Sequence, residues 1–179
     1  TYSQRSFEFI AETLGLKLLD AQYVSRYGGN IRAFMGKGVA IKSSKEEESA
    51  FFEQFTHMSQ NIKEWQSETK TWIEDYVAKN GKIRAKAFPG RAAIMIKLLN
   101  LDERHISAVY EITGSIKIQH FVPGTRIPIL PEVDLYSLED QAQPILNLAW
   151  HLPLEVRKNL AKNSYTGEVY DIKVFDGEG

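Results

Sequence analysis

The sequence contains no cysteine. This absence excludes disulfide bonds, thiolate nucleophiles and cysteine-liganded metal sites, and it leaves the redox compartment unreadable from the thiols. No apolar run is long enough to span a bilayer, and the first residues have neither the basic nor the apolar region of a signal peptide. The sequence therefore predicts no membrane association, and a cytoplasmic location is the default expectation.

An excess of charge of one sign is also lacking. The 179 residues include 22 Lys and Arg against 23 Asp and Glu, which gives a net charge of -1. Proteins that bind nucleic acid gather basic residues on one face, and no segment of this sequence does so. A nucleic-acid partner is therefore not expected. With 43% hydrophobic residues, the chain can bury a core as one domain or as a domain with an appendage.

Residues 1–42 read as a helix followed by a hairpin. Ser3 can cap a helix that Gly15 ends. Strand-like residues 16–23 and 30–39 flank the turn "RYGGN", whose glycines suit a backbone with positive φ. A helix and a two-stranded hairpin bury too little apolar surface to form a domain by themselves.

Residues 43–81 read as one long helix. "SSKEEE" supplies a serine cap and an acidic first turn, and the segment ends in Asn-Gly. At about 1.5 Å per residue the helix would be roughly 50 Å long. Two interpretations stay open: a connector that packs on more than one unit, or a seam that pairs with a second copy of the chain. The apolar seam repeats in steps of three and four and consists of Phe51, Phe55, Met58, Ile62, Trp65, Trp72 and Tyr76.

After Gly81 the pattern alternates between strands and short helices. This alternation predicts an α/β fold, a small Rossmann-like and mostly parallel sheet with helices on both faces. In such sheets ligands bind at the carboxyl ends of the strands. The expected strands are 83–88, 106–112, 145–150 and one near 168–174, and the expected helices are 91–100 and 154–163.

The turn "FPGR" between the first of these strands and the first helix is a candidate binding element. Gly90 lies in this turn, and Arg91 could contact an anion there, because a helix N-terminus directs free N–H groups at the turn. Glu111 ends the next strand about 20 residues later, where nucleotide-binding units place an acid for a ribose hydroxyl. The dinucleotide fingerprint has three glycines and this turn has one. A purely structural corner, with Glu111 at a solvated strand end, is the alternative interpretation.

Further candidates lie after other strands and in the loop between them. Lys117, Thr125 and Arg126 belong to a loop expected over the sheet edge, and Trp150 and His151 end a strand on the expected ligand side. An indole can stack on a sugar nucleotide and an imidazole can hydrogen-bond to it. The structural alternatives are a loop whose prolines only fix the turn and a tryptophan that belongs to the core.

Arg32 is a candidate in the hairpin. It faces opposite to Ile31 and could contact an anion in a cleft, or form a surface salt bridge. His57, His105 and His120 have no partners at the spacing of metal ligands, so no metal site is predicted in this chain.

Three segments, "RYGGNIRAFMGK", "VYEITGSIKIQHFVPGTRIPI" and "ILNLAWHLPLEV", in this order resemble the C-terminal region of nucleotide-sugar C-methyltransferases. The block Pro123 to Thr125, with Ile127 and Pro128, is the most specific part of the resemblance. Such enzymes depend on S-adenosylmethionine and add a carbon-bound methyl group to a deoxy keto-sugar on a nucleoside diphosphate. They have an N-terminal zinc module, a central methyltransferase domain and a C-terminal Rossmann-like domain that helps to hold the nucleotide sugar.

The resemblance implies how the chain is organised. Residues 1–42 would be the tail of the methyltransferase core, 43–81 a connecting helix, and 82–179 the C-terminal domain. The S-adenosylmethionine site, the catalytic base and the zinc module would belong to an N-terminal partner domain, so this chain alone is expected to be inactive. Its expected ligand is the nucleotide sugar.

The family commonly carries a Lys in the first turn of the helix after the glycine, and the aligned position here is Ile94. Arg91 is the candidate replacement, because a guanidinium binds phosphate in bidentate fashion. The competing hypothesis is a non-catalytic interaction module with a degenerate nucleotide-binding fold, in which the long helix or exposed strands make a homo-oligomer.

Overall fold

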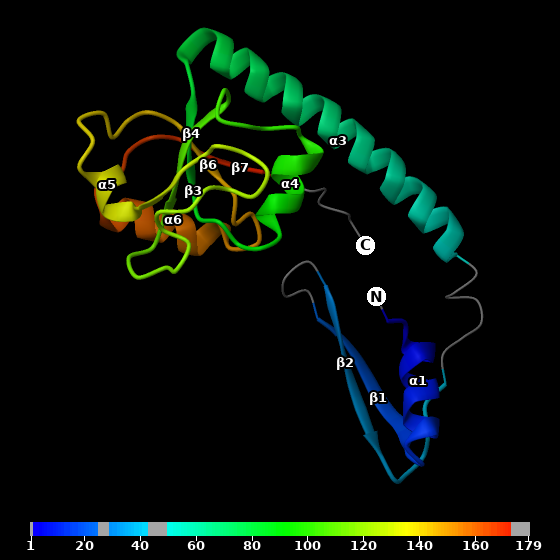
Figure 1. The fold of residues 1–179 in the computed structure, drawn as a ribbon. Coiled ribbons are helices and arrows are strands. Elements are labelled where there is room, and N and C mark those ends of the chain that lie inside the picture. The colour runs from blue at the N-terminus through cyan, green and yellow to red at the C-terminus, as the bar shows by residue number, and fades with distance from the viewer. Residues whose placement is uncertain (1, 25–28, 43–49, 173–179) are drawn as a thin grey trace. The chain divides into compact units, whose positions relative to one another are not determined.

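The computed structural model describes residues 2–24, 29–42 and 50–172. The chain divides into two compact units, Thr1–Met58 and Ser59–Gly179 (Figure 1). Each unit has its own sheet, and no strand of the first unit joins the sheet of the second within the described residues.

The first unit contains α1 (Gln4–Thr13) and the antiparallel strands β1 (Lys17–Val24) and β2 (Asn30–Gly36). Ser3 caps α1 as predicted, because its hydroxyl accepts the N–H of Ser6 while the Ser6 hydroxyl accepts the N–H of Ser3. The predicted turn between the two strands covers residues 26–30, and residues 26–28 of it lie outside the described residues.

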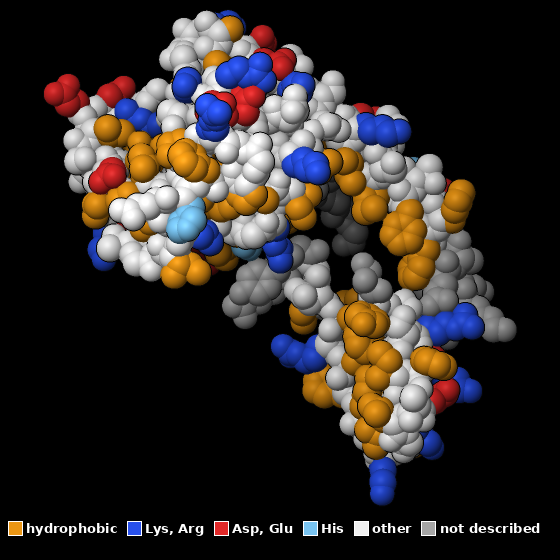
Figure 2. Space-filling view, viewed as in Figure 1, with side chains coloured by type: hydrophobic (Ala, Val, Ile, Leu, Met, Phe, Trp, Pro, Cys, Tyr) orange, Lys and Arg blue, Asp and Glu red, His pale blue; other side chains and the backbone are white. Residues whose placement is uncertain are grey.

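The first unit has a very small core. Among its described residues, only Ala11 and Leu18 are buried hydrophobic residues. Figure 2 shows hydrophobic side chains on the surface of this unit. A two-stranded sheet with one helix needs more buried apolar surface than this for independent stability. The large hydrophobic side chains that stay exposed are Tyr2, Phe9, Leu14, Tyr23, Phe34, Val39, Phe52, Phe55 and Met58.

The long helix is α3 (Phe51–Asn80). Its predicted serine cap and acidic first turn lie outside the described residues, and it ends as predicted at Gly81, which has a φ of 80°. Trp65 and Ile73 are buried in the core of the second unit, although the predicted seam did not include Ile73. Among the described helices, none is both long and apolar enough to cross a membrane.

The second unit is built on a parallel sheet, as the alternating pattern predicts. Every neighbouring pair in it is parallel, and the strand order is β5-β4-β3-β6-β7. The prediction of a small Rossmann-like domain is confirmed. The strands are β3 (Ile83–Lys86), β4 (Ile106–Glu111), β5 (Ile129–Pro131), β6 (Ile145–Asn147) and β7 (Val169–Asp171).

Helices cover both faces of this sheet (Figure 1). One core contains side chains of α3 and α4 (Ala92–Leu98), together with Ala85 and Leu146 from the central strands. The other contains side chains of α5 (Glu132–Tyr136) and α6 (Pro153–Lys162). Consecutive residues of a strand point to opposite cores. Val109, for example, lies in the first core, and Ala108 and Tyr110 lie in the second, as expected for a sheet buried on both sides.

Two strands are shorter than the sequence pattern predicts, and each ending has a local cause. The pattern predicts a strand over 83–88, but β3 stops before Ala87, which has a φ of 63°. It predicts a strand over 145–150, but the side-chain oxygen of Asn147 accepts the N–H of Ala149 and turns the chain. The five-residue helix α5 was not predicted, because it is too short to show a helical period.

We expect Ile73→Ala to lower the free energy of unfolding of the second unit by about 2–5 kcal/mol, because it opens a cavity in the core. Phe55→Ala on the same helix should change it by less than about 0.5 kcal/mol, since Phe55 is 57% exposed. The measurement is urea unfolding followed by tryptophan fluorescence. All three tryptophans of the chain, Trp65, Trp72 and Trp150, lie in this unit. Equal losses in the two variants would contradict this assignment of the core.

Candidate functional site

The corner between β3 and α4 lies at the carboxyl end of the central strand. The Ala87 N–H donates to the backbone oxygen of Tyr110 at 2.9 Å. The Phe88 N–H donates to the Glu111 carboxylate at 2.6 Å. Glu111 is only 7% exposed, so its carboxylate is committed to the backbone of the corner and not to a solvated strand end.

Lys117 completes this corner. Its ammonium donates to the backbone oxygen of Phe88 and lies 3.3 Å from the Glu111 carboxylate. The same ammonium lies 5.9 Å from the centre of the Phe88 ring. The Lys117 side chain is 41% exposed, so it is still accessible from solvent. Glu111 and Lys117 together bind both backbone polar groups of Phe88.

Arg91, Trp150 and His151 come together beside the corner. The Arg91 guanidinium carbon lies 6.0 Å from the centre of the Trp150 indole, a distance typical of a cation–π contact. The Trp150 and His151 rings meet edge to face, with centres 5.5 Å apart. Burial and the positive charge of Arg91 lower the pKa of His151, against a smaller opposite effect of Glu155. The cluster offers a guanidinium, an indole and an imidazole in one place.

Gly90 precedes Arg91 in an open position. Its φ is not in the left-handed region, and a Cβ placed there would meet no other atom within 4 Å. Neither backbone strain nor packing therefore requires a glycine at this corner. The open space leaves the backbone accessible to a ligand.

Thr125 and Arg126 lie elsewhere. The Thr125 hydroxyl donates to the Val122 oxygen at 2.9 Å and accepts the Ile127 N–H at 3.1 Å, so it closes a tight turn. The Arg126 N–H donates to the Glu103 carboxylate at 3.0 Å. Because Glu103 precedes β4 and the turn precedes β5, this contact lies at the amino edge of the sheet, opposite the Arg91 cluster.

Arg32 belongs to the other unit, where it is exposed and pairs with Gln22 across the hairpin.

A row of polar residues at the carboxyl edge, two of them buried, was missed. Lys86, Asn147 and Asp171 are register partners at the ends of three neighbouring strands. The Lys86 ammonium lies 2.7 Å from the Glu132 carboxylate, and the Asn147 amide donates to Asp171 at 2.7 Å. A sequence signal existed, because each of these short apolar strands ends in a polar residue. Glu132 belongs to α5, and Asp171 forms an ion pair with Arg157 of α6 at 2.8 Å, so the row ties both helices to the end of the sheet where the cluster lies.

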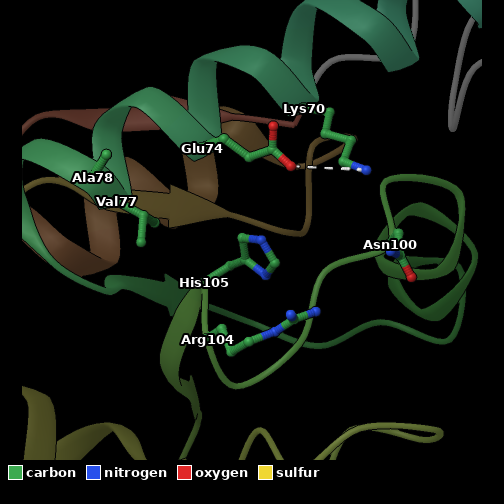
Figure 3. A pocket seen from close by; sticks show the side chains of 7 residues that line it. All are labelled: Lys70, Glu74, Val77, Ala78, Asn100, Arg104 and His105. Carbon is green, nitrogen blue, oxygen red and sulfur yellow. Dashed lines mark ion pairs between the residues drawn. The ribbon is translucent and has the colours of Figure 1, made fainter.

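A separate pocket of about 290 Å³ opens between α3 and the loop before β4. None of the predicted site residues lines it. Figure 3 shows the His105 ring pointing toward α3, where Lys70 and Glu74 form an ion pair with 3.8 Å between the charged atoms. Bonds to Arg104 lower the pKa of Asp102, which holds this loop together. The pocket is lined by Lys70, Glu74, Val77, Ala78, Asn100, Arg104 and His105.

Within residues 2–24, 29–42 and 50–172, no group of three or more acidic or histidine side chains could hold a metal ion.

A comparison was made with models of protein families. A family model for the C-methyltransferase C-terminal domain matches residues 26–170, which include β2, α3 and the parallel sheet except the last residue of β7, Asp171. This is the family that the three sequence segments indicated, so that prediction is confirmed. No curated protein matches the chain.

We expect the stability of the second unit to fall as pH drops through the ordinary histidine pKa of 6.5. The pKa of His151 is lower in the folded chain, so the unfolded chain takes up the proton first. In His151→Gln the fall should be smaller. Urea unfolding at a series of pH values measures this, and an unchanged fall in His151→Gln would refute it.

Proposed function

Because the chain belongs to the C-methyltransferase C-terminal domain family, we propose that it binds the nucleotide-sugar acceptor of an S-adenosylmethionine-dependent methyltransferase. The observation that carries this proposal is the cluster of Arg91, Trp150 and His151 at the carboxyl edge of the sheet. Parallel sheets covered on both faces bind ligands at this edge. A guanidinium beside an indole suits a ligand that combines a phosphate with a flat ring.

Each member of the cluster has a role in this proposal. Arg91 binds the diphosphate, Trp150 stacks on the base or the sugar, and His151 hydrogen-bonds to a phosphate or hydroxyl oxygen. The open position of Gly90 lets the diphosphate approach the backbone. Ile94, at the place of the family's usual Lys, is 58% exposed and uncharged, so Arg91 supplies the positive charge at this corner.

Membership of a methyltransferase family implies that the parent enzyme uses S-adenosylmethionine. The β3–α4 corner does not fit that cofactor, because it has one glycine and because Glu111 and Lys117 already bind both backbone polar groups of Phe88. We therefore assign acceptor binding to this chain and methyl transfer to another domain of the parent protein. Methyl transfer requires the cofactor to be held against the acceptor carbon, so this chain alone should be inactive.

The first unit is proposed to pack against the methyltransferase domain. Only Ala11 and Leu18 form its buried core, while Phe9, Tyr23 and Phe34 are exposed. An apolar surface of this kind gains stability when a partner covers it. In this proposal the unit links the acceptor-binding sheet to the domain that carries the cofactor.

A second candidate function is self-association through α3, and the exposed side chains of Phe52, Phe55 and Met58 favour it. Light scattering decides this candidate. A dimer that becomes a monomer in Phe55→Glu, together with no affinity for nucleotides, would favour an interaction module over acceptor binding. Trp65 is unsuitable for this test, because it is buried in the core of the second unit.

Calorimetric titration with thymidine and uridine diphosphates tests the proposal. We expect saturable binding, and a loss of about tenfold to a hundredfold in affinity in Arg91→Ala, because a charge-assisted bond to phosphate is removed. Arg126→Ala is the matched control, since Arg126 lies at the opposite edge of the sheet. S-adenosylhomocysteine should not bind. Absence of diphosphate binding, or equal losses in the two arginine variants, would contradict the proposal.

A further inference from the structure

The chain leaves β3 in a backbone conformation that L-amino acids with a side chain rarely adopt. Ala87 has a φ of 63°, in the left-handed region, where its Cβ crowds the following carbonyl group. Asparagine tolerates this region and glycine adopts it freely, but alanine has no such advantage. Strain of this kind persists only where the surrounding structure imposes it.

Two side chains from outside the corner impose the conformation. The buried Glu111 carboxylate accepts the N–H of Phe88 at 2.6 Å, immediately after the strained residue. Lys117 binds the oxygen of the same residue and lies 3.3 Å from Glu111. The Phe88 peptide groups are therefore held from both sides by an ion pair that the end of β4 and the following loop supply.

The corner fixes where Arg91 lies. The Pro89 oxygen accepts the N–H of Ala92 at 2.8 Å, so the bend passes directly into α4 with Arg91 at the start of the helix. From there the guanidinium reaches the Trp150 ring and lowers the pKa of His151. If Ala87 relaxed to a negative φ, the direction of the chain through Phe88 to Arg91 would change, and the guanidinium would leave this cluster.

We propose that Glu111 is a positioning residue, which holds the strained β3–α4 corner so that Arg91 meets the ligand beside Trp150, and which does not itself contact the ligand. The effect of Glu111 on ligand binding rests on the proposed acceptor binding. Its effect on the position of Arg91 does not, because that position can be measured in the chain without a ligand. Lys117 supports Glu111 by neutralising the buried carboxylate.

The test compares Glu111→Ala with the double variant Glu111→Ala and Ala87→Gly, using two measurements. The first is the pKa of His151 in the chain without ligand, from an NMR titration of the imidazole. The second is the affinity for uridine diphosphate by calorimetry. Glycine adopts positive φ without strain, so the double variant should keep more of the native corner than the single one. Glu111→Gln retains an oxygen acceptor for the Phe88 N–H, so both measurements should lie between those of the wild type and Glu111→Ala. If Glu111→Ala does not fold, Glu111→Gln replaces it in the comparison with the Ala87→Gly double variant.

In Glu111→Ala we expect the pKa of His151 to rise toward 6.5, because Arg91 moves away. Loss of a nearby carboxylate would by itself lower the pKa of an imidazole, so a rise reports the movement of Arg91 and not the missing charge. The affinity for the diphosphate should fall about tenfold, the effect of displacing one charge-assisted bond. Ala87→Gly should restore part of both values.

Glu103→Ala is the matched control, because the Glu103 carboxylate also accepts a backbone N–H, that of Arg126, but at the amino edge of the sheet. It should change neither measurement. If Glu111→Ala weakens binding while the pKa of His151 stays at the wild-type value and glycine at position 87 restores nothing, Glu111 contacts the ligand and the inference is wrong. If the wild-type chain binds no diphosphate, the acceptor-binding proposal fails, and the pKa comparison alone decides whether Glu111 positions Arg91.

Discussion

The buried hydrogen bond between the Phe88 N–H and the Glu111 carboxylate is the constraint on which the candidate site depends. A carboxylate taken out of water is unfavourable unless it is paired and hydrogen-bonded. Glu111 meets this condition with the Phe88 N–H and the Lys117 ammonium, and Lys117 also binds the backbone oxygen of Phe88. Because the buried Glu111 carboxylate needs the Phe88 N–H as a partner, the backbone that leaves β3 must direct this N–H toward Glu111.

The polar and charged side chains at the two edges of the parallel sheet differ in their partners and in their exposure to water. At the carboxyl edge, Lys86 pairs with Glu132 of α5, and Asn147 binds Asp171, which pairs with Arg157 of α6. Lys86 and Asn147 are buried. At the amino edge, Asp102 binds Arg104 of its own loop and Glu103 binds the N–H of Arg126 in another loop, and both arginines are exposed. Desolvated charge is therefore concentrated at the edge that carries the Arg91 cluster.

Sequence reasoning recovered the parallel sheet from four short, largely apolar segments that alternate with helical patterns, and these features do not depend on tertiary contacts. It did not include β5, which has three residues and follows β4 without a helix between them. It also placed Arg91, Trp150 and His151 at one edge, since all carboxyl ends of a parallel sheet meet there. It did not recover the end of β3, because Ala87 has a positive φ and the next residue, Phe88, donates its N–H to Glu111, which lies 24 positions beyond Ala87. No local propensity encodes such a contact.

The positions of the candidate residues in the loop between β4 and β5 also depend on the tertiary structure. From its composition the whole loop was expected to lie over one sheet edge, with Lys117, Thr125 and Arg126 on the ligand side. In a parallel pair, however, the chain must return from the carboxyl end of one strand to the amino end of the next. Lys117 therefore stays at the β3–α4 corner, while Thr125 and Arg126 lie at the far edge.

The two units differ in how many apolar side chains they bury, and therefore in how much stability each can gain from its own core. The second unit buries side chains on both faces of its sheet, and the Trp65 to Val77 part of α3 contributes to one of these cores. The described residues before Ser59 bury only Ala11 and Leu18. Conformational entropy opposes the ordering of every residue, whereas burial stabilises only those with a core. A unit with its own core, joined to a segment with almost none, is the arrangement that the proposed function requires, in which the first unit packs against the methyltransferase domain.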